Sequence, residues 1–199
     1  MDLSQISPVS WIDSRLEVRP SPIHGRGVFT TEKIAAGEIL MVWGGALFSL
    51  ADVYAGKAEA HSYAAIFEGV FLGHPAGQGN STDDFVNHSC DPNVWMLDEI
   101  TVAACREIAA GEEITADLVI WWDPDEAGVT WECHCGAPNC RKIFTSRDWR
   151  RPELQEKYRG HFVPYISQRI EELRRAESSF PLTPARQLPA DVQTGTFFR

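Results

Sequence analysis

Three cysteines lie close together late in the chain, in a spacing that suits metal chemistry. Cys133, Cys135 and Cys140 form a Cys-x-Cys-x4-Cys pattern, with Gly136 and Pro138 in the turn between the second and third thiols. Thiols grouped on a loop have little packing role, whereas a structural zinc ion takes four sulfur or nitrogen ligands in a tetrahedron. The segment therefore predicts a zinc site that needs one more ligand from elsewhere in the chain.

Four residues are candidates for the missing ligand: Cys90, Cys105, His88 and His134. Cys90 lies in the polar, turn-rich segment AsnHisSerCysAspProAsn at 87–93, where a cysteine of the apolar core is unexpected. Cys105 falls in an alternating strand pattern, where cysteine is commonly a small core residue. His134 lies between two ligands and would point away from the metal in an extended backbone. We therefore expect Cys90 to complete the tetrahedron.

Short strands joined by tight turns must position these thiols. The phrase IleAlaAlaGlyGlu occurs at 34–38 and again at 108–112. Each copy predicts a turn with glycine at a positive φ, followed by an apolar strand, at 39–43 and at 114–120. A further strand pair is expected around Glu68 and Gly69. Such short strands with only brief helical insertions are typical of an α+β domain that is mostly β.

The pattern changes to helix at Pro152, which suits a first helical position. Gly160 ends that helix, and Pro164 opens a second one. In the second helix apolar residues recur at i, i+4 and i+7, as Ile166, Ile170 and Leu173. Residues 178–199 carry three prolines among mixed polar residues and are expected to form a tail.

Composition and charge narrow the classes of function. The 199 residues suit one domain, and the net charge of −10 argues against direct nucleic-acid binding while it would attract a basic, lysine-containing peptide or protein. No apolar run approaches the roughly 18 residues of a membrane span. The start of the chain has no secretory pattern, and five cysteines do not suit a disulfide framework. We expect an intracellular, cytoplasmic setting; the oligomeric state is left open.

Four segments taken together resemble the SET-domain family. They are HisGlyArgGlyValPhe at 24–29, the segment at 87–93, GlyGluGluIleThr at 111–115, and CysHisCysGlyAlaProAsnCysArg at 133–141, in the family's order. The family consists of S-adenosylmethionine-dependent protein-lysine methyltransferases. The resemblance implies a SET-domain fold of small β-sheets with a pseudoknot, plus a post-SET zinc loop and C-terminal helices. It implies an N-terminal extension at 1–14, a SET domain at 15–122, a post-SET zinc segment at 128–146, helices at 147–177 and the tail at 178–199.

The resemblance also implies a cofactor site for S-adenosylmethionine. Arg26 and Gly27 would line the cofactor with their backbone, and Asn87 and His88 would bind its amino-acid and adenine portions. The cofactor would also be bordered by Tyr63 and Trp131. The zinc ligand from the core of the domain would be Cys90. A lysine acceptor must lose its ammonium proton before it attacks, and a narrow apolar channel favours that loss.

The catalytic part departs from the family's pattern. In the family, the third segment usually continues into an aspartate-tyrosine pair, and the tyrosine supplies the main catalytic hydroxyl. Here Leu118 follows Asp117, and a leucine side chain cannot form a hydrogen bond. The protein could still methylate a protein lysine, with Tyr63 or a water in place of the hydroxyl. It could instead be a non-catalytic binding module for S-adenosylmethionine. In a third interpretation, Leu118 and Ala116 enlarge the pocket for a small-molecule acceptor or another reaction, with a lining from Trp95, Trp121 and Trp122.

Overall fold

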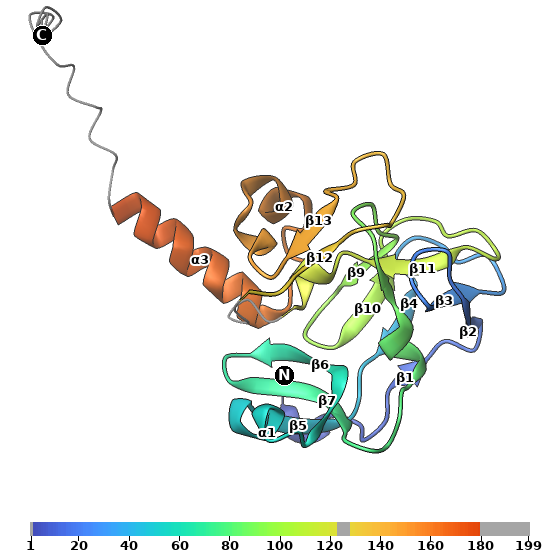
Figure 1. Cartoon of the computed structure of the whole chain (residues 1–199), viewed down its shortest axis with the longest axis horizontal. Coiled ribbons are helices and arrows are strands. Elements are labelled where there is room, and N and C mark those ends of the chain that lie inside the picture. The colour runs from blue at the N-terminus through green and yellow to red at the C-terminus, as the bar shows by residue number, and fades with distance from the viewer. Residues whose placement is uncertain (1, 123–127, 180–199) are drawn as a thin grey trace, which may run out of the picture.

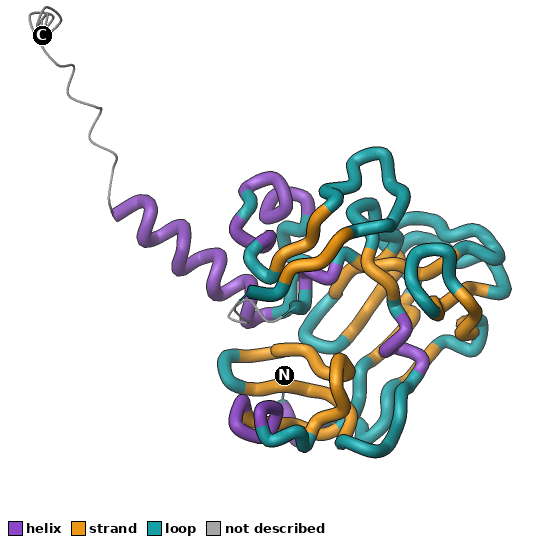
Figure 2. Tube along the Cα trace, viewed as in Figure 1, coloured by secondary structure: helices purple, strands orange, loops and turns teal. Residues whose placement is uncertain are grey.

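The computed structural model describes residues 2–122 and 128–179, and short strands make up most of its regular structure (Figures 1 and 2). The strands are β1 (Trp11–Ile12), β2 (Leu16–Pro20), β3 (Arg26–Thr30), β4 (Ile39–Val42), β5 (Ala46–Ser49), β6 (Ala58–Phe67), β7 (Val70–Pro75), β8 (Asn87–His88), β9 (Val94–Met96), β10 (Thr101–Ala104), β11 (Glu113–Ala116), β12 (Thr130–Glu132) and β13 (Ile143–Thr145). The α-helices are α1 (Leu50–Tyr54), α2 (Pro152–Lys157) and α3 (Pro164–Ser179). Single 3₁₀ turns are η1 (Leu3–Gln5), η2 (Thr82–Phe85), η3 (Leu118–Ile120) and η4 (Asp148–Arg150).

Three small sheets form the framework. The largest has the strand order β1-β4-β10-β9-β11-β3-β2, and β8 adds to it by pairing with β11. A separate sheet, β5-β7-β6, contains the strand pair expected around Glu68 and Gly69, and β12 pairs with β13. The β8–β11 pairing is parallel, with Asn87 beside Thr115 and His88 beside Ala116. Two segments that lie well apart in the sequence are therefore held side by side, as in the expected SET-domain fold.

The repeated phrase IleAlaAlaGlyGlu forms the same turn twice, as predicted. Gly37 has a φ of +86° and Gly111 a φ of +82°, a region that residues with a Cβ rarely adopt. The glutamate that ends each copy accepts a hydrogen bond from the backbone N–H three residues earlier. The two copies also pair with each other, because Ile34 and Ile108 exchange N–H to C=O hydrogen bonds of 2.9 and 3.0 Å. One local chemistry thus holds the segment before β4 against the segment after β10.

The strand expected at 114–120 is wrong beyond Ala116. At that point the carboxylate of Asp117 accepts a hydrogen bond from the N–H of Val119 and caps η3. An aspartate side chain that bonds its own backbone two residues on favours a turn over a sheet ladder. The turn matters for the site, because it directs Leu118 out of the sheet and into the cavity described below.

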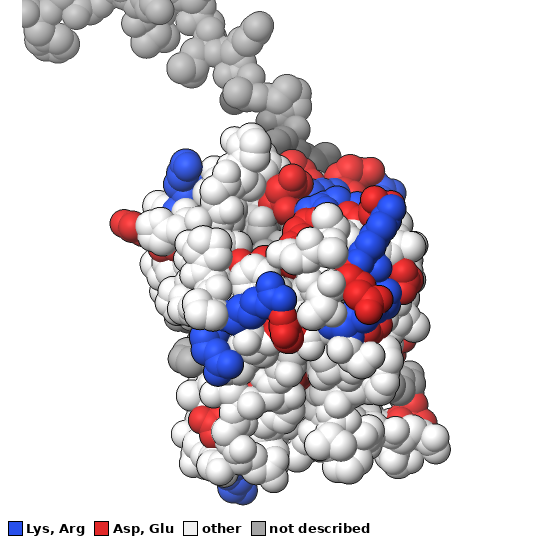
Figure 3. Space-filling model, turned by 90° about the vertical axis from the view of Figure 1, so that its right-hand side faces the viewer, with Lys and Arg blue, Asp and Glu red and all other residues white. Residues whose placement is uncertain are grey.

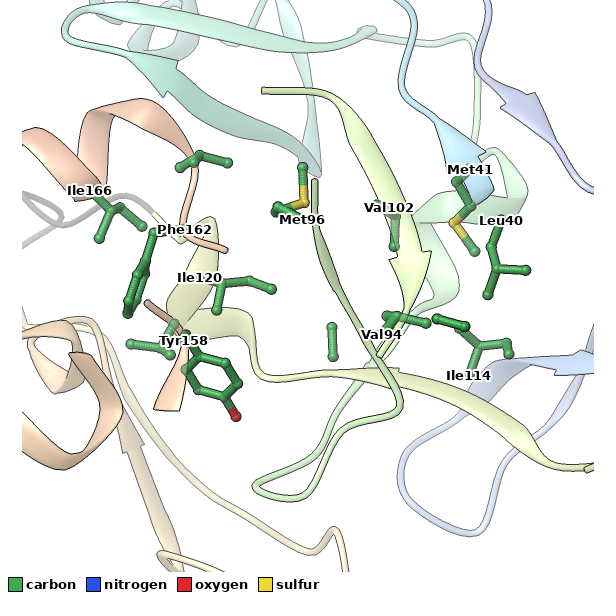
Figure 4. Packing of buried hydrophobic residues seen from close by; sticks show 14 of the residues in the cluster. Leu40, Met41, Val94, Met96, Val102, Ile114, Ile120, Tyr158, Phe162 and Ile166 are labelled. Atoms are coloured by element: carbon green, nitrogen blue, oxygen red, sulfur yellow. The ribbon is translucent and has the colours of Figure 1, made fainter. Parts of the chain in front are cut away.

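The core joins the main sheet to the C-terminal helices (Figure 4). Leu40, Met41, Val94, Val102 and Ile114 come from the sheet, while Ile120, Tyr158, Phe162 and Ile166 extend the same cluster toward α2 and α3. The N–H of Val163 donates to the carbonyl of Ile120 at 2.9 Å, which ties the segment between the helices to η3. The helices are therefore part of the hydrophobic core of the domain.

Helix α3 begins at Pro164 as predicted and projects from the body of the molecule in Figure 1. Its buried side chains, Tyr165, Ile166 and Ile170, all lie in its first two turns. The helix runs to Ser179, so the first two residues of the expected tail are helical, and 180–199 lie outside the described residues. Among the described helices, none is both long enough and apolar enough to cross a bilayer.

On the face drawn in Figure 3, acidic and basic side chains are interspersed rather than separated into large patches. Ion pairs around the repeated turns follow this pattern. Arg15 contacts Glu38, and Arg106 contacts Glu112, each at 2.7 Å. Exposed pairs of this kind contribute little to stability, so the framework depends on its core and its backbone pairing.

Candidate functional site

A cavity of about 720 Å³ lies between the β6–β7 hairpin and the start of β8. Its wall combines residues from β6 and β7, from the segment that runs from η2 to β8, from η3 and the two residues after it, and from β12. Five of the residues that the sequence predicts at the cofactor or the acceptor line this cavity, and they are Tyr63, Asn87, His88, Leu118 and Trp131. Positions spread over some 70 residues of sequence thus share one wall, which makes the cavity the candidate site for a bound molecule.

Arg26 and Gly27 are not among the residues that line the cavity, and the contact of their backbone with a cofactor stays a prediction. The Arg26 guanidinium lies over the ring of Phe85, 4.7 Å from its centroid. Gly27 lies against the Glu113 side chain, where a Cβ would collide with the carboxylate. The loop before them reaches the cavity instead, through Ile23 and His24.

Asn87 holds that loop in place. Its side-chain Nδ2 lies 3.2 Å from the carbonyl of His24, 3.0 Å from that of Arg26, and 2.7 Å from Oε1 of Glu113. An amide nitrogen has two hydrogens, so these acceptors compete for it. The residue expected to bind a cofactor therefore also fastens β3 to β8 and β11.

Tryptophan side chains form a large part of the cavity wall. Trp43 and Trp121 meet edge to face with ring centroids 5.0 Å apart, and Trp122 and Trp131 do so at 5.1 Å. All four line the cavity. Trp95 does not line it and instead stacks on His161, with the ring centroids 3.5 Å apart. The expected lining by Trp121 and Trp122 is thus observed, the expected lining by Trp95 is wrong, and Trp43 was missed.

The four thiols meet in space, although Cys90 is 43 residues before Cys133. The sulfur atoms of Cys90, Cys133, Cys135 and Cys140 all lie within 4.8 Å of one another, and those of Cys90 and Cys133 are 3.9 Å apart. Sulfurs on a tetrahedral zinc ion, with bonds of about 2.3 Å, are separated by about 3.8 Å. Cys105 instead contacts the carbonyl of Pro92 and stays outside the cluster, as expected.

Backbone N–H groups surround the thiol cluster. Arg141 N–H donates to the sulfur of Cys90 at 3.3 Å, Cys90 N–H to that of Cys135 at 3.5 Å, and Lys142 N–H to that of Cys140 at 3.4 Å. Lys142 has a φ of +66°, the one positive value among the described non-glycine residues. These donors stabilise sulfur in its charged, metal-binding form.

Burial and hydrogen bonding act in opposite directions on these thiols. Burial raises the pKa of Cys90 to about 11, although the Arg141 N–H opposes it. Burial also acts on Cys135, but N–H groups of Cys90 and Ala137 outweigh it and lower the pKa of that thiol to about 7. Several thiolates in so small a volume repel one another, so the arrangement suits a shared cation.

His88 links the thiol cluster to the cavity. Its Nδ1 accepts a hydrogen bond from the N–H of Leu118 at 3.3 Å, so the proton of the neutral ring belongs on Nε2, 3.5 Å from the Cys90 sulfur. Burial lowers the pKa of His88 to about 4, against the opposing field of Asp117. The ring is therefore neutral at pH 7.

A buried ionic network, not foreseen from the sequence, lies behind Leu118. Arg141 donates from Nη1 and Nη2 to the two oxygens of Asp117, at 2.6 and 2.8 Å, and from Nε to Asp148 at 3.0 Å. The Tyr158 hydroxyl donates to Asp117 at 3.0 Å. The position of Arg141 directly after Cys140 was the available signal, because it places a guanidinium beside the thiol cluster.

A cavity walled by paired central segments, next to a four-thiol cluster, defines a β-rich ligand-binding domain with a candidate metal centre. Residues 25–117 match the family described as SET domain. The chain is 31% identical over 136 residues to the histone-lysine N-methyltransferase trithorax of Drosophila virilis, covering 62% of this chain and 3% of that protein. It is 32% identical over 137 residues to histone-lysine N-methyltransferase 2B of Homo sapiens, covering 62% of this chain and 5% of that protein.

A solved structure is similar as well. The crystal structure of KRYPTONITE in complex with mCHG DNA and SAH matches with a TM-score of 0.53 and 26% identity, over 66% of this chain and 29% of that chain. Residues 25–117 therefore form a SET domain. The chain spans only a few per cent of the length of these two curated relatives.

Proposed function

We propose that this chain is an S-adenosylmethionine-dependent methyltransferase that acts on a lysine side chain of a protein. The observation that carries the proposal is the cavity of about 720 Å³, on whose wall Asn87, His88 and Leu118 from the paired family segments come together. The relatives are histone-lysine N-methyltransferases by name, and the similar KRYPTONITE structure holds SAH. SAH is S-adenosylhomocysteine, the product that S-adenosylmethionine becomes once its methyl group has been transferred.

The cavity wall fits such a cofactor. The indole Nε1–H of Trp122 is buried on this wall and has no hydrogen-bond partner among the described residues. An unpartnered buried donor costs free energy that a ligand acceptor would recover. Tryptophan and tyrosine faces attract cations, which suits a sulfonium group. When bound, S-adenosylmethionine supplies an activated methyl group, and the residues of the chain have to orient the acceptor relative to it.

The acceptor end of the cavity differs from the family's pattern at Leu118. Leucine offers no hydroxyl, but Tyr63 lines the same cavity and carries one. Apolar walls disfavour the ammonium form of an entering lysine and so favour the neutral amine that attacks the methyl group. The net charge of −10 suits a basic protein partner such as a histone tail.

We also propose that Cys90, Cys133, Cys135 and Cys140 hold a structural zinc ion. Four sulfurs leave no open position on a tetrahedral zinc, so this ion would stabilise the fold and take no part in methyl transfer. It would hold residue 90 against the segment 133–140. Metal analysis of the purified chain should find one zinc per chain.

Transfer of label tests the main proposal. The zinc-loaded chain is incubated with methyl-labelled S-adenosylmethionine and histone-tail peptides, and with the same peptides carrying arginine in place of lysine. Label should enter only the lysine peptides, with equal release of S-adenosylhomocysteine. Leu118→Tyr restores a hydroxyl at the cavity and should increase the rate by about tenfold or more.

The matched control for that variant is Leu97→Tyr, which makes the same exchange at an exposed leucine and should leave the rate unchanged. Binding of S-adenosylmethionine, measured by calorimetry, distinguishes the outcomes. Binding without transfer to any lysine acceptor would contradict the enzymatic proposal and favour a binding module. Transfer to the arginine peptides or to a small molecule would contradict the assignment of the acceptor.

A further inference from the structure

A second group of metal-ligand side chains lies on the wall of the cavity, apart from the thiols. His74 comes from β7, and Asp83 and Asp84 come from η2. The Nε2 atom of His74 lies 3.8 Å from Oδ1 of Asp83 and 3.8 Å from Oδ1 of Asp84. One nitrogen and two carboxylate oxygens thus lie within 4.8 Å of one another, and all three residues line the cavity.

In each aspartate, the carboxylate oxygen that does not face His74 accepts a hydrogen bond that fixes the group. Oδ2 of Asp83 accepts a hydrogen bond from the Ser10 hydroxyl at 2.6 Å, and Oδ2 of Asp84 accepts one from the Ser81 N–H at 2.7 Å. The Oδ1 atoms are thereby turned toward the imidazole. Hydrogen bonds from outside a coordination sphere orient metal ligands in this manner. The two aspartates are therefore fixed with one oxygen each directed to a common point.

Among the described residues, His74 is the one basic side chain that the two carboxylates contact, and an imidazole balances their charge only when it is protonated. The side chains of Asp83 and Asp84 are each 8% exposed, and within residues 2–122 and 128–179 no lysine or arginine forms an ion pair with either. In the same described ranges, Oδ1 of Asp83 is buried with no hydrogen-bond partner. Buried anions without a cation are costly, so this arrangement calls for one.

We propose that His74, Asp83 and Asp84 form a binding site for a divalent metal ion, separate from the four-thiol cluster. One imidazole and two carboxylates suit manganese, iron(II) or zinc, whereas thiolates select zinc or other soft metals. Bonds of about 2.1 Å separate two ligand atoms by about 3.4 Å in a tetrahedron and about 3.0 Å in an octahedron, so each carboxylate oxygen would have to approach Nε2 of His74 by about 0.4 to 0.8 Å from 3.8 Å. The remaining coordination positions open to the cavity, for water or for an oxygen of a bound molecule.

The ion has a consequence for the cavity that depends on the proposed methyltransferase function. Two carboxylates on the wall favour the ammonium form of a nearby lysine, which is the wrong form for attack on a methyl group. A bound divalent ion cancels their charge and removes this effect. The binding site itself does not depend on that function, because its ligands and their burial are properties of the folded chain.

Manganese binding tests the proposal without any assay of activity. The chain is first loaded with one equivalent of zinc, which the four thiolates take in preference to an imidazole and two carboxylates. It is then titrated with Mn²⁺ while free Mn²⁺ is followed by electron paramagnetic resonance. Carboxylate and imidazole ligands accept Mn²⁺, and thiolate sites filled with zinc do not. We expect one Mn²⁺ per chain, with no release of zinc. Asp83→Asn and His74→Gln should each weaken binding by about tenfold or more.

Glu68→Gln is the matched control, since it removes one carboxylate from the exposed turn of the same β6–β7 hairpin and should leave Mn²⁺ binding unchanged. The melting temperature provides a second measurement: Mn²⁺ should raise it for the native sequence and for Glu68→Gln, and not for Asp83→Asn. If the native chain binds no Mn²⁺, or if Glu68→Gln weakens binding as much as Asp83→Asn, the site does not exist. Failure of the methyl-transfer assay would leave these results unaffected.

Discussion

Replacing Arg141 with methionine should destabilise the fold strongly. The Arg141 side chain is 7% exposed and makes a two-point contact with Asp117, which is fully buried, as well as a contact with Asp148, which is 8% exposed. Methionine keeps most of the apolar stem and the backbone N–H that donates to Cys90, but it removes the one arginine or lysine that pairs with either carboxylate in the described residues. The substitution therefore isolates the loss of the buried charge.

The magnitude follows from the burial of the two partners. Breaking a buried pair by removing one member costs about 3–5 kcal/mol, because the other charge stays buried without compensation. Asp117 keeps hydrogen bonds from Tyr158 and Val119, and Asp148 keeps one from Thr145. We therefore expect Arg141→Met to lower the free energy of unfolding by about 4 kcal/mol. In a chain of about 200 residues each kcal/mol lowers the melting temperature by about 2–4 °C, so the midpoint should fall by about 8–16 °C.

Urea unfolding followed by tryptophan fluorescence, at a fixed zinc concentration, measures this cost. Arg159→Ala is the control, since that arginine is 69% exposed and should contribute less than about 0.5 kcal/mol. Arg141→Lys keeps the charge but loses the fork that reaches both carboxylates, so its loss should fall between those of the other two variants. A loss below about 1 kcal/mol for Arg141→Met, with zinc content unchanged, would refute the reasoning.

Three further predictions use the same preparation. Tyr158→Phe removes a hydroxyl donor from buried Asp117 and should cost about 1–2 kcal/mol in urea unfolding; an unchanged midpoint would contradict the contact. Cys133→Ser should lower the zinc content to well below one per chain, while Cys105→Ser should retain the metal, as measured by elemental analysis. Gly37→Ala and Gly111→Ala should each cost about 1–2 kcal/mol, because their φ values penalise a Cβ, and unequal losses would contradict the shared turn.

Local chemistry could be predicted well from the sequence. The thiol spacing and the polar setting of Cys90 pointed to a cluster that the structure assembles, because few roles other than metal binding bring four cysteines together. The turns at Gly37 and Gly111 followed from glycine's access to positive φ. Each of these features depends on a short segment whose own residues specify the geometry.

Contacts between distant segments could not be predicted in this way. Gly27 carries a family motif, but whether its backbone meets the cavity depends on where Glu113 and Asn87 lie across the sheet. The convergence of His74 with Asp83 and Asp84 likewise depends on how η2 folds back on β7. In the sequence, His74 is separated from Asp83 by eight residues and the three show no recognisable ligand spacing, so only the tertiary structure reveals the cluster.

The attachment of residue 90 to the end of the domain has a consequence for the order in which the protein forms. Cys90 meets Cys133, its carbonyl accepts a hydrogen bond from Lys157 at 2.8 Å, and the carbonyl of Met96 contacts His161 at 2.8 Å. During translation the central segment leaves the ribosome long before any of these partners. The wall of the cavity therefore cannot be completed before the last third of the chain has been synthesised. A nascent protein would acquire its binding site late and almost all at once.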